Sequence, residues 1–262
     1  MTSASVYQQL RTNLAYLRLE AAAEALAPVL DQATKEKLSH SAFLERLLRI
    51  EVTATEERRL GGRRRFACLP AAWRLEDFDF EAQPELDKKL VDELATLRFV
   101  EEACNVLLIG PPGVGKTHLA VSLGHKAIEA GYRTYYTTAA DLAARCHRAA
   151  IEGRWQYTMR FFAGPSLLII DELGYLPLAS EAAAALFQVV SQRYLKGSIV
   201  LTTNRGIPQW GQIFNDDPTI AAAMLDRLLH RAAVLNIDGE SYRMRTHRAR
   251  VDNVRRALGG RA

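Results

Sequence analysis

A glycine-rich stretch between a short apolar run and a helical pattern constrains this chain more than any other feature. The stretch covers residues 110–117, with the sequence Gly-Pro-Pro-Gly-Val-Gly-Lys-Thr, and it joins the apolar run 104–109 to the helical pattern 117–130. Glycines let the backbone curl so that its N–H groups converge on one point, and the helix that follows adds the positive end of its dipole. The stretch therefore predicts a phosphate-binding loop in the strand-to-helix setting that such a loop needs.

The residue types of this loop fit a nucleoside triphosphate. Lys116 can place its ammonium group beside the β- and γ-phosphates, and Thr117 can offer its hydroxyl to Mg²⁺. We therefore expect ATP or GTP to bind here together with Mg²⁺. The expected binding set is Gly110, Pro111, Pro112, Gly113, Val114, Gly115, Lys116, Thr117 and His118.

Two later apolar runs end in polar residues that suit the same chemistry. Four apolar residues at 167–170 indicate a strand covered on both faces, whose end carries Asp171 and Glu172 toward the phosphate loop. We expect Asp171 to hold Mg²⁺ through water and Glu172 to polarise the attacking water, although a strand that exits into solvent by chance looks the same. The run 198–205 ends in polar residues, and we expect one of them, Asn204, to hydrogen-bond the γ-phosphate or the attacking water. A turn-forming asparagine is the alternative at that position.

Strand and helix patterns alternate from residue 104 to residue 237, which predicts a doubly wound parallel α/β sandwich. The strand patterns cover 104–109, 132–137, 167–172, 198–205 and 232–237. The helical patterns cover 86–101, 117–130, 139–151, 154–162 and 220–231. The polar residues that end these strands should then meet at one edge of the sheet.

Ahead of this sandwich, the sequence predicts a small all-helical domain. Apolar positions three or four residues apart predict one helix over 4–30, which fades near Pro28, and a second over 41–50. The charged run 56–65 contains a glycine pair, and we interpret it as the link to the main domain. The predicted division is a helical domain at 1–65, a nucleotide-binding domain at 66–240 and a basic tail at 241–262.

The net charge of +4 is distributed unevenly. Residues 1–65 carry a net charge of +3 and residues 227–262 one of +6, whereas the middle of the chain carries −5. Basic ends on an acidic middle favour a polyanion as partner, and charge that serves only solubility is the alternative. The triplet Arg63, Arg64 and Arg65 fits a phosphate backbone and a solvated linker equally well.

The segment 69–80 is rich in aromatic and acidic residues. Its aromatic side chains could pack beside a bound base or against the core. We favour the core, because buried aromatic side chains are common.

Composition argues against membrane, zinc and disulfide proteins. No apolar run approaches the roughly 18 residues of a membrane span, and no secretion signal opens the sequence, so we expect a cytoplasmic protein without a membrane partner. The three cysteines, Cys68, Cys104 and Cys146, are too scattered for a zinc site or a disulfide framework. The six histidines form no metal-ligand pair, so Mg²⁺ is the metal we expect.

Four motifs together resemble an AAA+ ATPase of the clade that contains the initiator DnaA and the helicase loader DnaC. They are the phosphate loop, Asp171-Glu172, Thr203-Asn204 and the helix with Asp226-Arg227-Leu228. A closer resemblance, over roughly residues 66–247, is to the IstB family, the ATPase subunit encoded beside a transposase in some insertion sequences. It rests on residues 116–120 (KTHLA), 171–177 (DELGYLP), 226–230 (DRLLH) and 239–243 (GESYR).

The resemblance implies a function and a set of catalytic residues. Such proteins use ATP to assemble on duplex DNA as a homo-oligomeric spiral or ring, select target sites and stimulate the cognate transposase. Arg227 matches the arginine finger, which completes the ATP site of a neighbouring subunit, with His230 and Arg231 as near rivals. An arginine that only pairs with a surface acid is the alternative. The implied catalytic set is Lys116, Glu172, Asn204 and Arg227.

The resemblance also points to DNA contacts and to a shortened C-terminus. The helices between 141 and 162 resemble the extra helical insertion of the initiator clade, and helix-surface arginines that are merely solvated are the alternative. The candidate DNA contacts are Arg145, Arg148, Arg154, Arg160 and Tyr175, together with Arg63, Arg64 and Arg65. Residues 238–262 are too few for the helical lid of other AAA+ proteins, which leaves Arg243 and Arg245 open between nucleotide, DNA and transposase.

Two other functions share parts of this pattern. A replicative helicase loader of the DnaC type would have the same ATPase core but a protein ring as its client. A nucleotide-gated architectural DNA-binding protein would need no hydrolysis, and the intact set Lys116, Asp171, Glu172 and Arg227 argues against it.

Overall fold

The computed structural model describes residues 3–175, 177–215 and 217–245, and the chain divides into two compact units, Met1–Gly62 and Arg63–Ala262. The basic tail expected from residue 241 lies mostly outside the described residues, so the three-part division of the chain stays a prediction. Within the described ranges, no helix has both the length and the apolar character that crossing a membrane requires.

The first unit contains α1 (Ser3–Tyr16), α2 (Glu20–Glu36) and most of α3 (His40–Ala67). The single helix predicted over 4–30 is wrong, because the chain turns between α1 and α2. Arg18 has a left-handed φ of 60°, and the Leu19 N–H donates to the Leu14 carbonyl oxygen at 2.9 Å, which closes the end of α1. The turn lets α1 pack against α2 over a core of Ala22, Leu26, Val29 and Leu47, whereas one straight helix would leave these apolar stripes unpaired.

The charged run 56–65 is helical and lies inside α3. Its glycine pair predicted a break, and each glycine in a helix interior costs about 1 kcal/mol relative to alanine. An ion pair between Arg58 and the buried carboxylate of Glu51, at 2.6 Å, lies within the same helix. The predicted helix over 41–50 is therefore the first part of a 28-residue helix.

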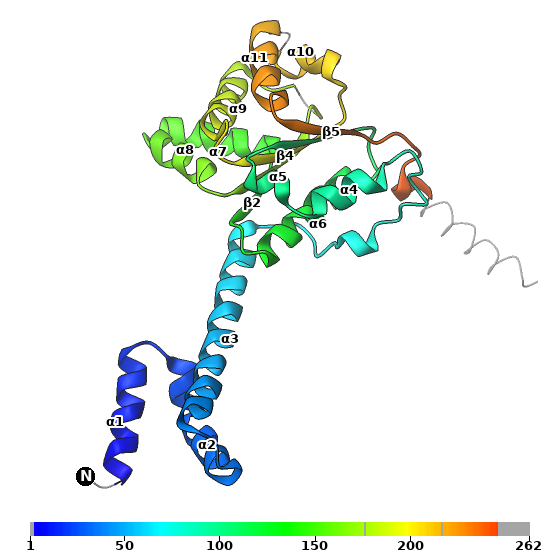
Figure 1. Ribbon diagram of the computed structural model, residues 1–262. Helices are drawn as coiled ribbons and strands as arrows, with labels where there is room; N and C mark the ends of the chain where they lie inside the picture. The colour runs from blue at the N-terminus through cyan, green and yellow to red at the C-terminus, as the bar shows by residue number, and fades with distance from the viewer. Residues whose placement is uncertain (1–2, 176, 216, 246–262) are drawn as a thin grey trace, which may run out of the picture. The chain divides into compact units, whose positions relative to one another are not determined.

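The second unit is built on a parallel five-stranded sheet with the order β2-β3-β4-β1-β5, which confirms the predicted doubly wound sandwich (Figure 1). The strands are β1 (Asn105–Ile109), β2 (Thr134–Thr138), β3 (Leu167–Leu173), β4 (Ser198–Thr203) and β5 (Ala232–Asn236). Alternate residues of one strand serve opposite faces: Leu168 and Ile170 join one core cluster, and Leu167 and Ile169 join the other. Burial on both faces explains why these strands are continuous apolar runs.

Helices cover both faces of the sheet (Figure 1). Side chains of α6 (Lys116–Glu129) and α4 (Lys88–Ala95) pack in one core cluster, and those of α7 (Ala139–Ile151), α8 (Trp155–Ala163), α9 (Ser180–Arg193) and α11 (Pro218–Leu229) pack in the other. Short helices complete the unit: η1 (Leu75–Asp77), α5 (Arg98–Glu101), η2 (Ile207–Gln209) and α10 (Trp210–Ile213). The sequence pattern assigned no element to the segment that forms α9.

The helix predicted over 86–101 is two helices, α4 and α5. Leu97 separates them with a left-handed φ of 65°. This turn buries Leu97, Phe99 and Val100 against the sheet, where a continuous helix would direct them to different sides.

Candidate nucleotide-binding site

The chain between β1 and α6 has the backbone of a phosphate-binding loop. Gly113 and Gly115 have φ values of 87° and 101°, in the left-handed region that only glycine adopts without strain. Gly110 is required for a different reason, because a Cβ atom there would lie 2.1 Å from the carbonyl oxygen of Ile237. Local conformation and close packing therefore explain the three glycines of the sequence motif.

Lys116, the first residue of α6, is nearly enclosed. Its side chain is 5% exposed, and its Nζ donates to the carbonyl oxygens of Gly110 and Pro111, both at 2.7 Å. Burial lowers the pKa of Lys116 to about 8, with the positive charge of Arg243 acting in the same direction and the carboxylate of Asp171 opposing it. A buried ammonium in this environment gains most from an anionic ligand, which would restore the favourable interactions lost with water.

Asp171 lies beside the loop with its carboxylate buried. Thr117 donates its hydroxyl to Oδ1 at 3.1 Å, Thr202 donates to the same oxygen, and Tyr136 donates to Oδ2 at 2.7 Å. Burial and the hydrogen bond to Asp171 raise the pKa of Tyr136, which keeps its phenol a donor. No salt bridge reaches Asp171 from any residue that the structure describes.

These neighbours fit Mg²⁺. A hydroxyl oxygen and a buried carboxylate oxygen lie 3.1 Å apart next to a phosphate-binding loop, and both are ligand types that Mg²⁺ prefers. In the described part of the chain no cluster of three His, Cys, Asp or Glu residues could form an all-protein metal cage. A site with few protein ligands is the usual one for Mg²⁺ that is held together with substrate phosphates.

Glu172 follows Asp171 but has a different environment. The pairing between β3 and β4 is irregular from Ile170 to Leu173, and Glu172 has a left-handed φ of 63°. Its backbone N–H donates to the Thr202 hydroxyl at 2.9 Å, while its side chain is exposed and lines a cavity. The two successive carboxylates therefore have different environments, one buried and one exposed at the cavity.

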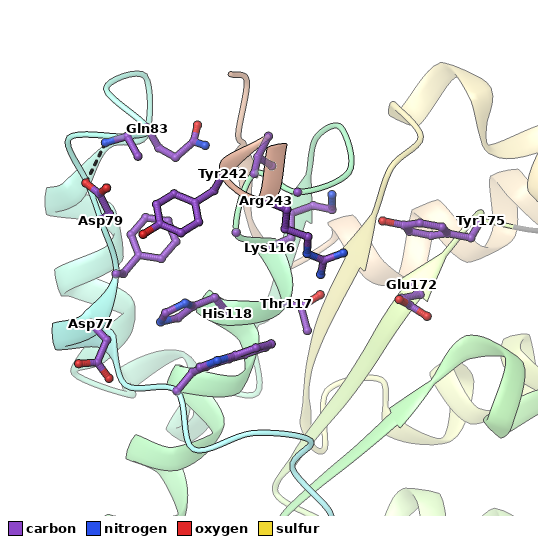
Figure 2. Close-up of a pocket in the computed structure, with 16 residues that line it drawn as sticks. Asp77, Asp79, Gln83, Lys116, Thr117, His118, Glu172, Tyr175, Tyr242 and Arg243 are labelled. Carbon is purple, nitrogen blue, oxygen red and sulfur yellow. Dashed lines mark hydrogen bonds between the residues drawn. The ribbon is translucent and has the colours of Figure 1, made fainter. Parts of the chain in front are cut away.

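The cavity has a volume of about 340 Å³ and lies in front of the phosphate loop (Figure 2). Its wall combines the loop and the start of α6 with the segment 73–83, the end of β3 and the segment after β5. Of the expected catalytic residues, Lys116 and Glu172 line it. Arg227 and Asn204 do not.

Aromatic residues form the end of the cavity near His118. The ring of Trp73 stacks on the imidazole of His118, with centroids 5.5 Å apart and planes 16° apart, and Phe78 meets His118 edge-on at 5.4 Å. Phe78 and Leu75 belong to the core, as expected for this segment, whereas Trp73 is 39% exposed and lines the cavity. The aromatic segment therefore serves both the core and the cavity.

The segment after β5 passes over the phosphate loop, a role that the sequence pattern left open. The Ile237 N–H donates to the Ile109 carbonyl oxygen at 2.7 Å, and the Tyr242 N–H donates to the Gly113 carbonyl oxygen at 3.0 Å. These bonds place Arg243 in the cavity wall. No local pattern could reveal this, because the partners are more than a hundred residues apart in the chain.

Arg245, two residues further on, has a different partner. It forms an ion pair with Asp79 at 3.1 Å, and both side chains remain nearly half exposed. Gln83 also contacts this segment, since its Nε2 donates to the Glu240 carbonyl oxygen at 3.3 Å. The segment after β5 is thereby joined to the segment 73–83.

Asn204 lies at the end of β4, just behind the cavity wall. Its Oδ1 is buried and has no hydrogen-bond partner among the residues that the structure describes. The same oxygen lies 3.3 Å from the position that a Cβ atom would take on Gly174, in the loop that follows Glu172. This acceptor is thus unpaired next to the loop that follows the exposed carboxylate of Glu172.

Arg227 is half-buried on α11, away from the cavity of its own chain. Its guanidinium lies 4.4 Å from the centroid of the Phe187 ring of α9, and its Nη1 donates to the Ala223 carbonyl oxygen at 3.4 Å. His230 and Arg231, the near rivals for the same role, are exposed. The structure does not bring any of these three residues into the cavity.

The arginines of α7 and α8 differ in their surroundings. Arg148 and Arg154 are exposed and line a shallow groove together with Tyr157, and Arg160 is exposed on α8. Arg145 also borders this groove, but its guanidinium lies 3.7 Å from the Phe161 ring centroid. Arg145 is therefore partly committed to packing.

The remaining candidates for DNA contact are also placed. Arg63 donates to the Ile128 carbonyl oxygen at 3.2 Å, and Arg64 pairs with Glu129 at 3.5 Å, so two of the triplet contact the end of α6. Arg65 is exposed. Tyr175 lines the nucleotide cavity.

The fold and this site define a P-loop nucleotide-binding protein with a parallel α/β sheet. The structure resembles AMPPCP-bound DnaA from Aquifex aeolicus, with a TM-score of 0.54, 21% identity and coverage of 65% of this chain and 51% of that one. It resembles DnaI to the same TM-score, 0.54, with 17% identity and coverage of 63% of this chain and 91% of that one. These two likenesses concern the fold.

The chain belongs to the family of IstB-like ATP binding proteins, whose model matches residues 12–250. A relative from Geobacillus stearothermophilus, named for insertion sequence IS5376 and for ATP binding, is 43% identical over 88% of this chain and 92% of its own length. A relative from Pseudomonas aeruginosa, named for insertion sequence IS21 and ATP binding, is 42% identical over 92% of this chain and 90% of its own length. The resemblance stated from the sequence motifs is thereby confirmed.

Proposed function

We propose that this chain is an ATPase of an insertion sequence that uses ATP to assemble on duplex DNA, select a target site and stimulate the cognate transposase. One observation carries the ATPase assignment: a single cavity is lined by Lys116, by the exposed carboxylate of Glu172 and by Thr117, whose hydroxyl donates to the buried carboxylate of Asp171. Membership in a family of insertion-sequence ATP-binding proteins supports the biological setting.

The phosphate end of the site binds by charge and by backbone donors. Lys116 exchanges its two loop carbonyls for phosphate oxygens, and the N–H groups at the start of α6 point toward the same oxygens. Thr117 and Asp171 would hold Mg²⁺, which when bound supplies positive charge at the β- and γ-phosphates. Arg243 adds a second cationic side chain to the cavity wall from the segment that is bonded to the phosphate loop.

Hydrolysis requires a water molecule that is oriented and polarised. Glu172 has the exposed carboxylate for this task, because Asp171 is committed to its three hydroxyl donors. We propose that Asn204 hydrogen-bonds the attacking water, which can donate to the unpaired Oδ1, or the γ-phosphate, to which Nδ2 can donate. Trp73 and His118 offer a stacked aromatic surface for the base at the other end.

We further propose that Arg227 acts on the nucleotide of a neighbouring subunit. It lies outside its own cavity and is held over Phe187, so a homo-oligomer would supply it in trans. An arginine finger raises the rate of nucleotide hydrolysis by about 10³ to 10⁵ where it has been removed and restored. Hydrolysis would then require assembly.

Duplex DNA is the proposed template for assembly. Arg148 is exposed on α7, Arg160 on α8 and Arg65 near the end of α3, and Arg154, which pairs with Glu152 at 3.5 Å, is exposed just before α8. Arginines without a base-reading helix bind phosphates and respond to DNA deformability, so we expect weak sequence preference and strong salt dependence.

ATP turnover with and without duplex DNA tests this function. We expect turnover that duplex DNA stimulates, with Lys116→Ala as the inactive reference. Turnover equal to that of Lys116→Ala under both conditions would contradict the ATPase assignment. Stimulation by a helicase ring or by single strands, with no response to duplex DNA, would instead identify a helicase loader.

A further inference from the structure

We infer that Tyr175 belongs to the ATP site, where its phenol O–H donates a hydrogen bond to the γ-phosphate and distinguishes ATP from ADP. The sequence motifs had placed this residue among the DNA contacts. The inference rests on the proposed function and assigns one more residue to the same site.

The position of Tyr175 is the first observation. It lies three residues after Glu172 and lines the nucleotide cavity together with Glu172 and Arg243. Figure 2 shows its ring on the side of the cavity opposite His118, with the phenol oxygen directed inward toward Arg243. The hydroxyl therefore faces the phosphate end of the cavity and not the end with the stacked aromatic rings.

The charges around the phenol agree with this position. Burial and the carboxylates of Glu172 and Asp171 raise the pKa of Tyr175, and the guanidinium of Arg243 opposes them. The groups that act on the phenol are thus those proposed to act on the phosphates and on the attacking water. A phenol that keeps its proton is a hydrogen-bond donor at neutral pH.

The backbone before Tyr175 is fixed by close packing. Gly174 has a left-handed φ of 88°, and a Cβ atom there would lie 2.9 Å from Cγ of Arg205 and 3.0 Å from Cδ1 of Ile213. Arg205 also donates from Nε to the Gly174 carbonyl oxygen at 3.5 Å. The loop is therefore held against the end of β4, beside the unpaired oxygen of Asn204.

A donor at this place has a specific use. Phosphate oxygens accept hydrogen bonds, and the γ-phosphate is the group that ADP lacks. The carboxylate of Glu172 repels the phosphates, so a neutral donor beside it can bind the γ-phosphate without competing for the water. Because its loop packs against β4 near Asn204, Tyr175 would also connect the γ-phosphate to the sheet.

Tyr175→Phe tests the inference because it removes only the hydroxyl. The matched control is Tyr157→Phe, on α8, where the tyrosine is 68% exposed and borders the groove with Arg148 and Arg154. The affinities of a non-hydrolysable ATP analogue and of ADP are measured by competition against a fluorescent nucleotide. We expect Tyr175→Phe to weaken the ATP analogue about tenfold and to leave ADP unchanged, the size of one hydrogen bond to a charged acceptor.

The control and a DNA measurement complete the test. Tyr157→Phe should leave both nucleotide affinities unchanged, and Tyr175→Phe should leave duplex DNA affinity unchanged when the ATP analogue is saturating. Equal losses for ATP analogue and ADP, or no loss for either, would overturn the inference. Loss of DNA affinity with unchanged nucleotide affinities would return Tyr175 to the DNA surface. Wild-type protein that binds no nucleotide would contradict the proposed function itself, whatever Tyr175→Phe does.

Discussion

Arg243 offers the sharpest test of how the segment after β5 takes part in nucleotide binding. We predict that Arg243→Gln weakens ATP binding about tenfold, because a hydrogen bond between charged groups contributes roughly 1.5–3 kcal/mol and this side chain stays in contact with solvent.

Arg245→Gln is the matched control. Arg245 is two residues away on the same segment, but it pairs with Asp79 and both side chains are more than 40% exposed. Exposed ion pairs contribute about 0–1 kcal/mol, so ATP affinity should change by less than about fivefold. Isothermal titration with a non-hydrolysable ATP analogue measures both variants. Equal affinities for Arg243→Gln and Arg245→Gln would refute the placement of Arg243 at the phosphates.

Three further predictions follow from single contacts. Gly110→Ala should abolish nucleotide binding, because the new Cβ atom would lie 2.1 Å from a backbone oxygen. Gly62→Ala in α3 meets nothing within 4 Å, so it should raise the free energy of unfolding, measured by urea denaturation, by about 1 kcal/mol. Phe187→Leu should lower ATP turnover about tenfold and leave ATP affinity unchanged, because it removes the ring that lies 4.4 Å from the guanidinium of Arg227. Phe187→Tyr keeps an aromatic ring, so equal turnover in the two variants would contradict this role. Bound phosphates should raise the pKa of Lys116 above its value of about 8, so ATP affinity should be highest below pH 8 and should fall as the pH rises above 8. An ATP affinity that does not change between pH 7 and pH 9.5 would count against this assignment.

Much of this site could be predicted because its residues follow strands. The phosphate loop, Asp171 and Glu172 lie at the carboxyl ends of apolar runs, and a parallel sheet brings such ends to one edge. The irregular pairing of β3 with β4 and the left-handed backbone at Glu172 could not be predicted, because they depend on contacts between the two strands.

The sequence left open the roles of residues that distant segments contribute. Trp73 and Arg243 line the cavity from segments before and after the sandwich in the chain, and local patterns allowed each of them more than one role. The N-terminal helices show the same limit, since tertiary packing decides that the chain turns at Arg18 and continues as a helix through Gly61 and Gly62.

The central claim is that ATP hydrolysis uses residues from two subunits, and mixing two inactive variants tests it most directly. Lys116→Ala lacks its own nucleotide site but keeps Arg227, whereas Arg227→Ala keeps the nucleotide site and lacks the arginine. Equal mixing on duplex DNA should restore about a quarter of wild-type turnover, the share of interfaces that pair the two intact halves at random. Turnover that stays at the level of either variant alone, at every mixing ratio, would contradict a shared site.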